Sequence, residues 1–146
     1  MMDYIGTAKV YLDEGAKMPS RAHSDDAGYD IYARETKCIP AGGSAVFDTG
    51  VHIDIAKGFY GEIKSKSGLC VKHDLTATGV IDSGYKGAIV VKLTNHGKDD
   101  YIVVAGDKIA QLVISAFAAP ALVQVEELSK LGESERGSNG FGSTGR

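Results

Sequence analysis

The chain has 146 residues, of which 43% are apolar and 24% are charged, and these values fit one globular domain with a core of its own. The net charge of −3 implies no large basic surface and argues against a general nucleic-acid-binding protein. Two cysteines, Cys38 and Cys70, are too few for a disulfide framework. We expect reduced, partly buried thiols in a reducing compartment.

The first residues predict a cytoplasmic protein. The stretch MMDYIGTAKVYL has an early acidic residue and no sustained apolar run, so we do not expect it to act as a signal peptide. No run approaches the roughly 18 apolar residues of a membrane-spanning helix. We therefore expect no membrane partner.

Along the chain, most apolar residues recur with the period of two that indicates β-strands. The strand candidates, in order, are YDIYA, GVHIDIA, GFYGEI, AIVVKLTN, DYIVV and KIAQLVISAF. The last one could be buried on both faces. Turns are predicted at residues 42–43, 95–97 and 105–107, and one short helix is possible after Ser67. The pattern predicts an all-β domain, either a sandwich or a barrel.

The first loop of chemical interest is DDAGYDIYA, residues 25–33. Ala27 and Gly28 form a tight entry, and Asp30 then lies inside an otherwise apolar strand, where aspartate is disfavoured. Two interpretations are open. Asp30 either faces solvent on a half-exposed strand or holds Mg²⁺, directly or through the water shell of the ion.

The second loop is IKSKSGL, residues 63–69. Lys66, Ser67 and Gly68 offer a cation, a hydroxyl and an unhindered backbone N–H group, which together suit a phosphate. Such a tripeptide is also typical of an ordinary exposed turn, so it does not decide the function by itself.

The third loop is TATGVIDSGYKGAIVV, residues 76–91. Its small residues predict a hairpin in which a planar ligand approaches the backbone closely. Asp82 would lie at the mouth of this hairpin, where a general base could act. The alternative is a plain hairpin in which Asp82 caps its own turn.

The chain ends in RGSNGFGSTGR, residues 136–146, which has too few apolar groups to build a core. It is either a flexible terminus or an arm that becomes ordered over a ligand. An arginine, hydroxyls and backbone N–H groups suit phosphates, and the ring of Phe141 suits a flat base.

Five stretches taken together resemble the trimeric dUTPase family. They are AGYDIYA, KSGL, GVIDSGYKG, GDKIAQL and RGSNGFGSTG, and they follow the order of the family motifs over essentially the whole chain. The resemblance implies a jelly-roll-like β-barrel over residues 1–130 and a flexible C-terminal arm over residues 131–146. It also implies a homotrimer with three shared active sites, each closed by the arm of another subunit.

The resemblance further implies hydrolysis of dUTP to dUMP and pyrophosphate, which limits uracil in DNA and supplies dUMP for dTMP synthesis. Asp82 matches the carboxylate that activates the attacking water, and Tyr85 matches the ring beneath the deoxyribose. Phe141 would stack on uracil. The implied substrate-binding residues are Lys66, Ser67, Gly68, Thr76, Thr78, Gly79, Val80, Ile81, Tyr85, Val90, Gln111, Arg136, Phe141, Gly142, Ser143 and Thr144.

Mg²⁺ is the implied cofactor, held mainly by the triphosphate, with Asp30 and Gln111 contacting it through water. The sequence departs from the family pattern at Ser65–Lys66, where relatives usually have an arginine after a proline. Lysine lacks the planar bidentate fork of arginine, so the α-phosphate would be oriented more loosely.

Two other functions remain open. A dCTP deaminase shares the fold but needs a glutamate at the pyrimidine ring, and no glutamate lies between Glu62 and Glu126. A dUTP-sensing protein whose arm signals to a regulatory partner is the non-enzymatic alternative, although a regulatory contact could coexist with catalysis.

Overall fold

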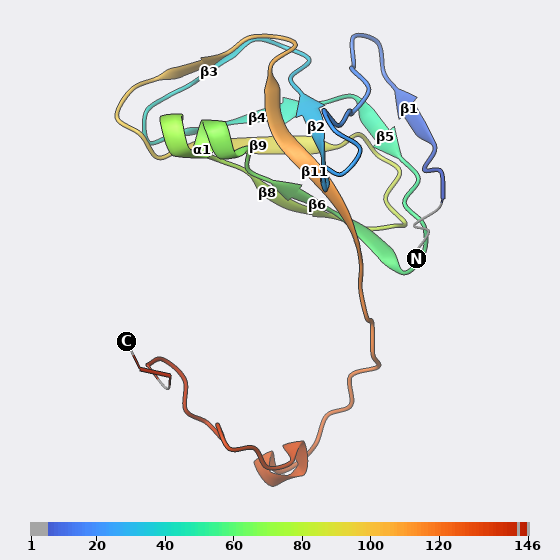
Figure 1. Cartoon of the computed structure of the whole chain (residues 1–146), viewed down its shortest axis with the longest axis vertical. Coiled ribbons are helices and arrows are strands. Elements are labelled where there is room, and N and C mark those ends of the chain that lie inside the picture. Colours follow the sequence, from blue (N-terminus) through green and yellow to red (C-terminus); the bar gives the residue numbers. More distant parts are fainter. Residues whose placement is uncertain (1–5, 143, 146) are drawn as a thin grey trace.

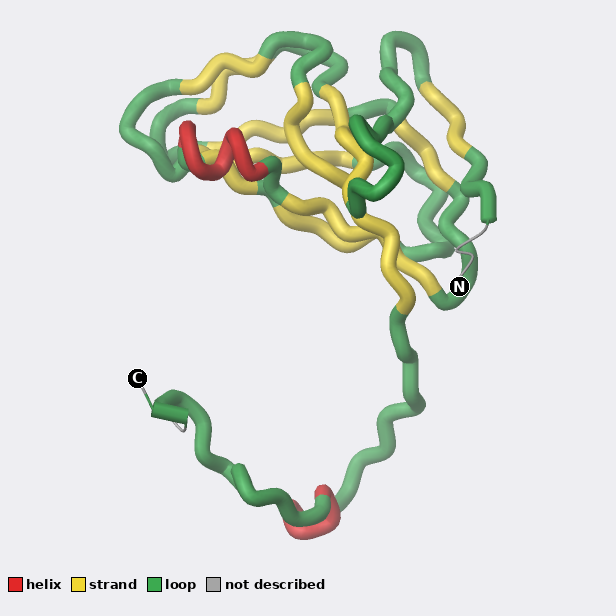
Figure 2. The backbone as a smooth tube through the Cα atoms, viewed as in Figure 1, coloured by secondary structure: helices red, strands yellow, loops and turns green. Residues whose placement is uncertain are grey.

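The computed structural model describes residues 6–142, 144 and 145, and it consists mainly of short β-strands (Figures 1 and 2). The strands are β1 (Val10–Leu12), β2 (Gly28–Tyr32), β3 (Lys37–Ile39), β4 (Ser44–Asp48), β5 (Val51–Ile53), β6 (Phe59–Lys64), β7 (Leu75–Thr76), β8 (Thr78–Ile81), β9 (Val90–Asn95), β10 (Tyr101–Val103) and β11 (Lys108–Ala116). The helix α1 (Ser67–His73) and the short 3₁₀ helix η1 (Leu128–Leu131) complete the elements.

Two larger sheets form the body of the molecule. One has the strand order β2-β11-β6-β8 and the other β4-β9-β7, while β1-β5 and β10-β3 form two smaller antiparallel pairs. Strands distant in sequence therefore become neighbours, as when β11 pairs with both β2 and β6. The loops before β2, after β6 and after β8 therefore all adjoin strands of the same sheet, β2-β11-β6-β8 (Figure 1).

The core lies between the sheets and follows from the alternation of side chains along each strand. In β9, Val91 and Leu93 are buried while Val90 and Lys92 are exposed. Burial of each large aliphatic side chain contributes about 1.5–3 kcal/mol to folding. The largest fully buried side chains are Phe47, Ile31, Ile39, Ile63, Leu75, Ile89, Leu93, Ile109, Leu112, Val51, Val91 and Val103.

The predicted all-β, jelly-roll-like class is confirmed, as are the strand candidates and the short helix that begins at Ser67. The prediction that β11 is buried on both faces is confirmed for Ile109 and Ala110, where a register shift interrupts the pairing with β2. The second half of β11 is only partly buried. The strands β1, β3, β4 and β7 were not predicted. They are short, and exposed residues such as Ser44 and Asp48 dilute their apolar pattern.

Both cysteines are free thiols, in agreement with the sequence. Cys38 is exposed rather than partly buried, because it lies on the outward face of β3 next to the inward-facing Ile39. Among the described residues, no helix is long and apolar enough to cross a membrane.

The chain leaves the sheets after β11 and continues as an extended tail (Figure 1). Phe117 contacts the body through a bond from its N–H to the Gly58 carbonyl (3.1 Å) and an edge-on contact of its ring with Tyr60. Residues 117–142 are all exposed, so the exposed segment begins well before the predicted arm.

Candidate active site

Asp30 is the most enclosed charged group of the candidate site. It lies on β2 opposite Gln111 of β11, and it retains only 8% of its accessible surface. Lys66 bonds to its Oδ1 and Lys108 lies 2.8 Å from its Oδ2. The solvent-facing interpretation of Asp30 is therefore wrong, because two lysines from β11 and the β6–α1 loop cover the carboxylate.

The electrostatics of this cluster favour the ionised carboxylate. Burial opposes the negative charge, but hydrogen bonds and attraction from Lys108 and Lys66 outweigh it and lower the pKa of Asp30 below its usual value of 3.8. The same interaction raises the pKa of Lys108. Two cations around one anion leave a net positive charge, as a phosphate site requires.

Gln111 lies beside this cluster, and Gly28 makes room for it. Its Nε2 donates to the Ser65 carbonyl (3.0 Å). A Cβ atom at position 28 would stand 2.2 Å from its Oε1, so a larger residue in the AGYDIYA motif would displace the amide from this position. Sequence reasoning attributed Gly28 to the turn alone.

Ser65 is a residue that sequence reasoning missed. Its Oγ donates to the Ala77 carbonyl (3.1 Å) and accepts from the Ala77 N–H (2.9 Å). It thereby ties the loop before α1 to the point where β7 gives way to β8. The only sequence signal was its place in the KSKSG run, where the lysines drew attention to charge.

Ser67 and Gly68 open helix α1 and are exposed. Lys66 precedes them in extended conformation, and no side chain caps the helix. A Cβ atom at Gly68 would meet nothing within 4 Å, so packing within the chain does not require this glycine. The backbone here is open to a ligand.

The predicted hairpin of residues 76–91 requires a correction. The ladder of β8 runs to β6, whereas β9 pairs with β4 and β7. The two strands are confirmed, but each finds its partner in a different sheet, so they do not pair with each other. The connection is consequently splayed, and Thr78, Val80 and Val90 have exposed side chains along it.

Thr76 lies on the other side of this divergence. It belongs to β7, pairs with Thr94 of β9, and its Oγ1 lies 2.8 Å from Nε2 of His96. Its hydroxyl is thus already engaged within the chain. Gly79 is half-buried and Ile81 is buried against the core, so only backbone atoms of Ile81 can face a ligand.

Asp82 lies at the tip of the splayed connection and is exposed. No hydrogen bond or ion pair within residues 6–142, 144 and 145 engages its carboxylate. Its carbonyl accepts from the Tyr85 N–H (3.0 Å), and the Tyr85 hydroxyl donates to the Ala88 carbonyl (2.9 Å). A Cβ atom at Gly87 would stand 2.4 Å from that hydroxyl, so this glycine admits the tyrosine ring.

The motif residues of the tail do not meet the loops of their own chain. Arg136, Phe141, Gly142 and Thr144 are exposed, and Ser143 lies outside the described residues. Arg136 donates from Nε to the Asn139 carbonyl within the tail (2.9 Å). Among described residues, all hydrogen bonds of residues 127–145 join tail residues to one another.

The described residues contain no group of three or more histidine, cysteine or acidic side chains that could hold a metal ion. Two hollows of the body are lined by Lys9, Tyr11, His52 and Lys86 and by Leu69, Tyr101 and Lys108, among others. Neither is lined by Asp82 or Gln111.

Comparison with known proteins gives a family. Residues 14–145 match the dUTPase family model. The chain is 44% identical over 137 residues to the deoxyuridine 5′-triphosphate nucleotidohydrolase of Yarrowia lipolytica, covering 93% of this chain and 87% of that protein. It is 43% identical to the enzyme of the same name from Clostridium acetobutylicum, covering 92% of each chain.

Solved structures agree with these sequence matches. The dUTPase of Staphylococcus bacteriophage 80alpha with dUpNHpp superposes with a TM-score of 0.90 at 34% identity, covering 97% of this chain and 100% of the other. A variant dUTPase from phage phi11 of S. aureus, described with a structural Mg(II) ion, gives a TM-score of 0.78 at 34% identity, covering 85% and 99%.

Proposed function

The chain belongs to the dUTPase family, and on that premise we propose that it is a cytoplasmic enzyme that hydrolyses dUTP to dUMP and pyrophosphate, with Asp82 as the base. The contrast between two carboxylates carries the choice of base. Asp30 is buried between two lysines, whereas Asp82 is exposed and free of partners within the described residues. We therefore infer that Asp82, rather than Asp30, takes a proton from water and contacts the 3′-hydroxyl.

Uracil binds where β8 and β9 diverge. Backbone groups of residues 78–81 and of Val90 border this opening, and a fixed backbone pattern that suits uracil leaves polar groups unpaired against cytosine. Tyr85 lies beneath the deoxyribose, held by its bond to the Ala88 carbonyl, and its ring crowds a 2′-hydroxyl. Thr76 contributes at the edge of the base.

The triphosphate binds along the loop before α1. Lys66 brings positive charge, and the exposed backbone of Ser67 and Gly68 offers N–H donors. Gln111 is fixed beside them by its bond to the Ser65 carbonyl. Because Lys66 is also bonded to Asp30, its ammonium is positioned before the substrate arrives, which offsets part of the loss of the arginine fork.

The residues present fit Mg²⁺ that is bound through water. Mg²⁺ keeps several waters and takes one or two carboxylates together with substrate phosphates. Asp30 and Gln111 are cross-strand neighbours, and each carboxylate oxygen of Asp30 keeps acceptor capacity beyond its lysine bond. When bound to the triphosphate, Mg²⁺ neutralises charge that develops on the leaving pyrophosphate. Asp30 and Gln111 would orient its water shell.

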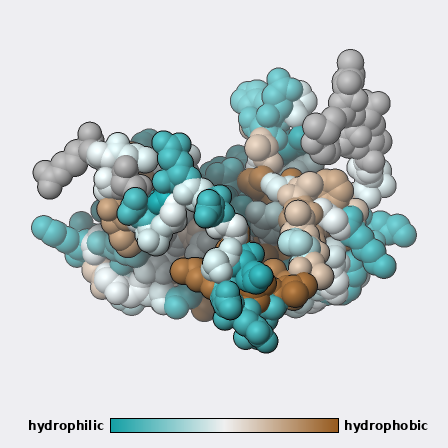
Figure 3. All heavy atoms as spheres, turned by 90° about the horizontal axis from the view of Figure 1, so that it is seen from below, coloured by the Kyte–Doolittle hydropathy of each residue, from teal (hydrophilic) through white to brown (hydrophobic). Residues whose placement is uncertain are grey.

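The tail closes the site of another subunit in a homotrimer. Arg136, Gly142, Ser143 and Thr144 hold the β- and γ-phosphates, and Phe141 stacks on uracil. Support comes from the exposed apolar side chains of the tail, among them Leu122, Val123, Leu128 and Leu131. These four lie within one short stretch, and a concentration of exposed apolar groups is the kind of feature that marks a surface for a partner. Figure 3, which views the molecule from the side of the tail, shows hydrophobic residues exposed there.

A nucleotide panel scored for pyrophosphate release tests the proposal. We expect Mg²⁺-dependent turnover of dUTP, with dCTP, dTTP and UTP at least about 10²-fold poorer in kcat/KM. Equal turnover of dCTP and dUTP would contradict the assignment of the uracil site. Light scattering tests the shared site separately, since a monomer at working concentration would exclude it. The reaction limits uracil incorporation into DNA and supplies dUMP for dTMP synthesis.

A further inference from the structure

His52 lies outside every motif of the candidate site but contacts the loop that carries Asp82. It is the central residue of β5 and pairs with Tyr11 of β1, whose ring packs edge-on against it at 5.5 Å. Its Nδ1 lies 2.7 Å from the Lys86 carbonyl oxygen. Its Nε2 lies 3.1 and 3.2 Å from the two carboxylate oxygens of Asp13.

Both ring nitrogens of His52 therefore face acceptors. A carbonyl oxygen and a carboxylate accept hydrogen bonds and have no proton to give. A neutral imidazole carries one N–H group, so it satisfies only one of these neighbours, whereas an imidazolium donates to both. The geometry is that of a charged histidine.

The bond between His52 and the Lys86 carbonyl connects β5 to the loop between β8 and β9, which carries Asp82. Ile89 at the end of the loop is fixed to β5, since its N–H donates to the Val51 carbonyl (2.8 Å). Within the loop, the Lys86 ammonium donates to the Ser83 carbonyl (2.9 Å) and pairs with Asp54. The backbone of Lys86 thus joins the turn of Asp82 to the sheet, and His52 holds that backbone in place.

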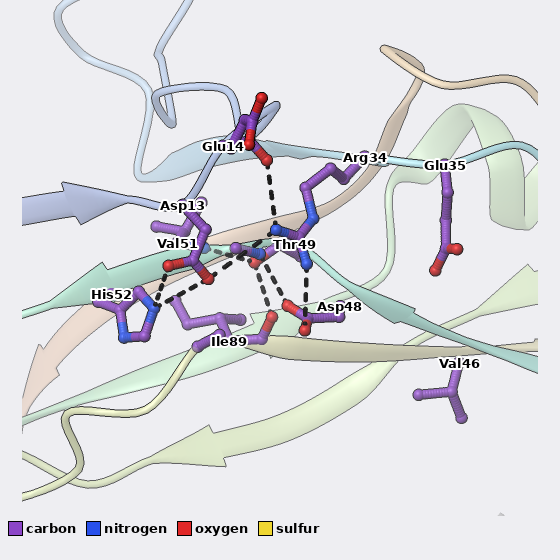
Figure 4. Close-up of polar contacts among 12 residues, drawn as sticks. Asp13, Glu14, Arg34, Glu35, Val46, Asp48, Thr49, Val51, His52 and Ile89 are labelled. Atoms are coloured by element: carbon purple, nitrogen blue, oxygen red, sulfur yellow. Dashed lines mark hydrogen bonds and ion pairs between the residues drawn. The ribbon is translucent and has the colours of Figure 1, made fainter.

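The charges around His52 come from several elements. Figure 4 shows Asp13 between His52 and Arg34, and Arg34 lies 3.9 Å from Asp13 and 3.2 Å from Asp48. The hollow that His52 lines also contains Lys9, Asp54 and Lys86. The bond to the Lys86 carbonyl, followed by that to Asp13, raises the pKa of His52 above 6.5.

We propose that His52 is a positioning residue for the hydrolysis, which in its charged form holds the Asp82 loop through the Lys86 carbonyl and releases that loop on deprotonation. The proposal rests on the proposed function of Asp82. Upon loss of one proton, the charge-assisted Nε2–H bond to Asp13 is the stronger and is kept. The Lys86 carbonyl then faces a nitrogen lone pair, and the loop loosens.

The sign of the pH effect follows from the direction of the shift. The folded-state pKa is raised, so the contribution of the charged ring is complete below pH 6.5 and is lost as the pH rises through the higher folded value. Loop protection and kcat should therefore fall together on the alkaline side.

Hydrogen exchange of residues 83–87 as a function of pH, corrected for intrinsic exchange rates, tests the proposal in the full chain. We expect protection in the wild type to fall about threefold to tenfold as His52 titrates, which corresponds to the loss of one hydrogen bond. NMR titration of the histidine rings assigns His52 by comparison with His52→Phe, which has no hydrogen-bond donor for the Lys86 carbonyl. That variant should lack the protection at all pH values.

Asp13→Asn separates a switch from a simple structural contact. An asparagine amide can donate to Nε2, so the neutral ring keeps its proton on Nδ1 and retains the Lys86 bond. Protection and kcat should then stay constant across the alkaline range. His23→Gln is the matched control, because exposed His23 also lies beside an aspartate, Asp26, and it should behave as wild type.

Protection in the wild type that is unchanged through the titration of His52 would overturn the proposal, as would an alkaline loss that persists unaltered in Asp13→Asn. The exchange data decide this without turnover. If the wild type releases no pyrophosphate from dUTP, the proposed function is wrong, while the measured protection still decides the role of His52.

Discussion

The Asp30 cluster and the C-terminal tail carry residues of one candidate site, but contacts within the chain fix only the cluster. Asp30 is bonded to Lys66 and Lys108, and Gln111 beside it is bonded to Ser65. The tail residues bond only to one another among the described residues, and Phe141 is fully exposed. The Asp30 cluster is thus in place before substrate binds. The tail must find its contacts on a surface other than the body of its own chain.

Asp82→Asn should produce the largest loss of turnover, because it removes the proposed base and leaves the Asp30 cluster unchanged. A positioned carboxylate base contributes about 10²–10⁴ in rate, so we expect kcat to fall by that factor with little change in dUTP binding. Single-turnover pyrophosphate release and equilibrium binding measure the two effects separately.

Asp99→Asn is the matched control for the charge. Asp99 is also exposed, and its backbone carbonyl accepts from the Asn95 side-chain amide, while no described residue pairs with its carboxylate. It should retain full turnover. An Asp82→Asn enzyme as active as this control would show that another group activates the water.

Removal of residues 136–146 should cause the next largest loss of turnover. It tests the tail separately from the Asp30 cluster. Loss of preorganised donors at developing charge costs about 10²–10³ in kcat. The thermal midpoint should stay unchanged, because the described residues of this segment form hydrogen bonds only with other tail residues. Calorimetry and turnover on the same sample test this. A large drop in the midpoint would mean that the tail stabilises the body.

Phe141→Ala narrows this test to the predicted base stacking. Stacking of an aromatic side chain on a base contributes about 1–3 kcal/mol, so KM for dUTP should rise by roughly 5- to 150-fold. Phe141→Tyr keeps the ring and should restore most of the affinity. If both variants bind dUTP as the wild type does, the ring does not contact the base.

The same contrast explains which parts of the structure could be predicted. Alternation of apolar residues indicated the strands β5, β6, β9 and β11, because burial of one face leaves a local signal. The divergence of β8 and β9 left no such signal, since strand pairing depends on which partner lies nearest in space. The two lysines on Asp30 were missed for the same reason, as Lys108 is 78 positions from it (108 − 30).

Asp30→Asn should have a smaller effect, measured on folding. Breaking a fully buried ion pair costs about 3–5 kcal/mol, but Lys66 and Lys108 reach solvent, so we expect about 1–2 kcal/mol in urea unfolding. Glu35→Gln is the control, because the exposed Glu35–Lys37 pair should contribute at most about 0.5 kcal/mol. Equal losses in both variants would mean that burial adds nothing to the Asp30 cluster.

The smallest effect concerns pH. We expect the difference in unfolding free energy between the wild type and Asp30→Asn to change with pH only outside a defined range. The folded-state pKa of Asp30 lies below 3.8, so its contribution is complete above pH 3.8 and is lost as the pH falls through the lower folded value. The pKa of Lys108 lies above 10.5, so its contribution is lost as the pH rises from 10.5 through that value. The two unfolding free energies should therefore differ by a constant amount between pH 3.8 and 10.5 and converge outside that range. Because groups elsewhere titrate alike in both proteins, a difference that drifts within this interval would mean that the lysines respond to something other than Asp30.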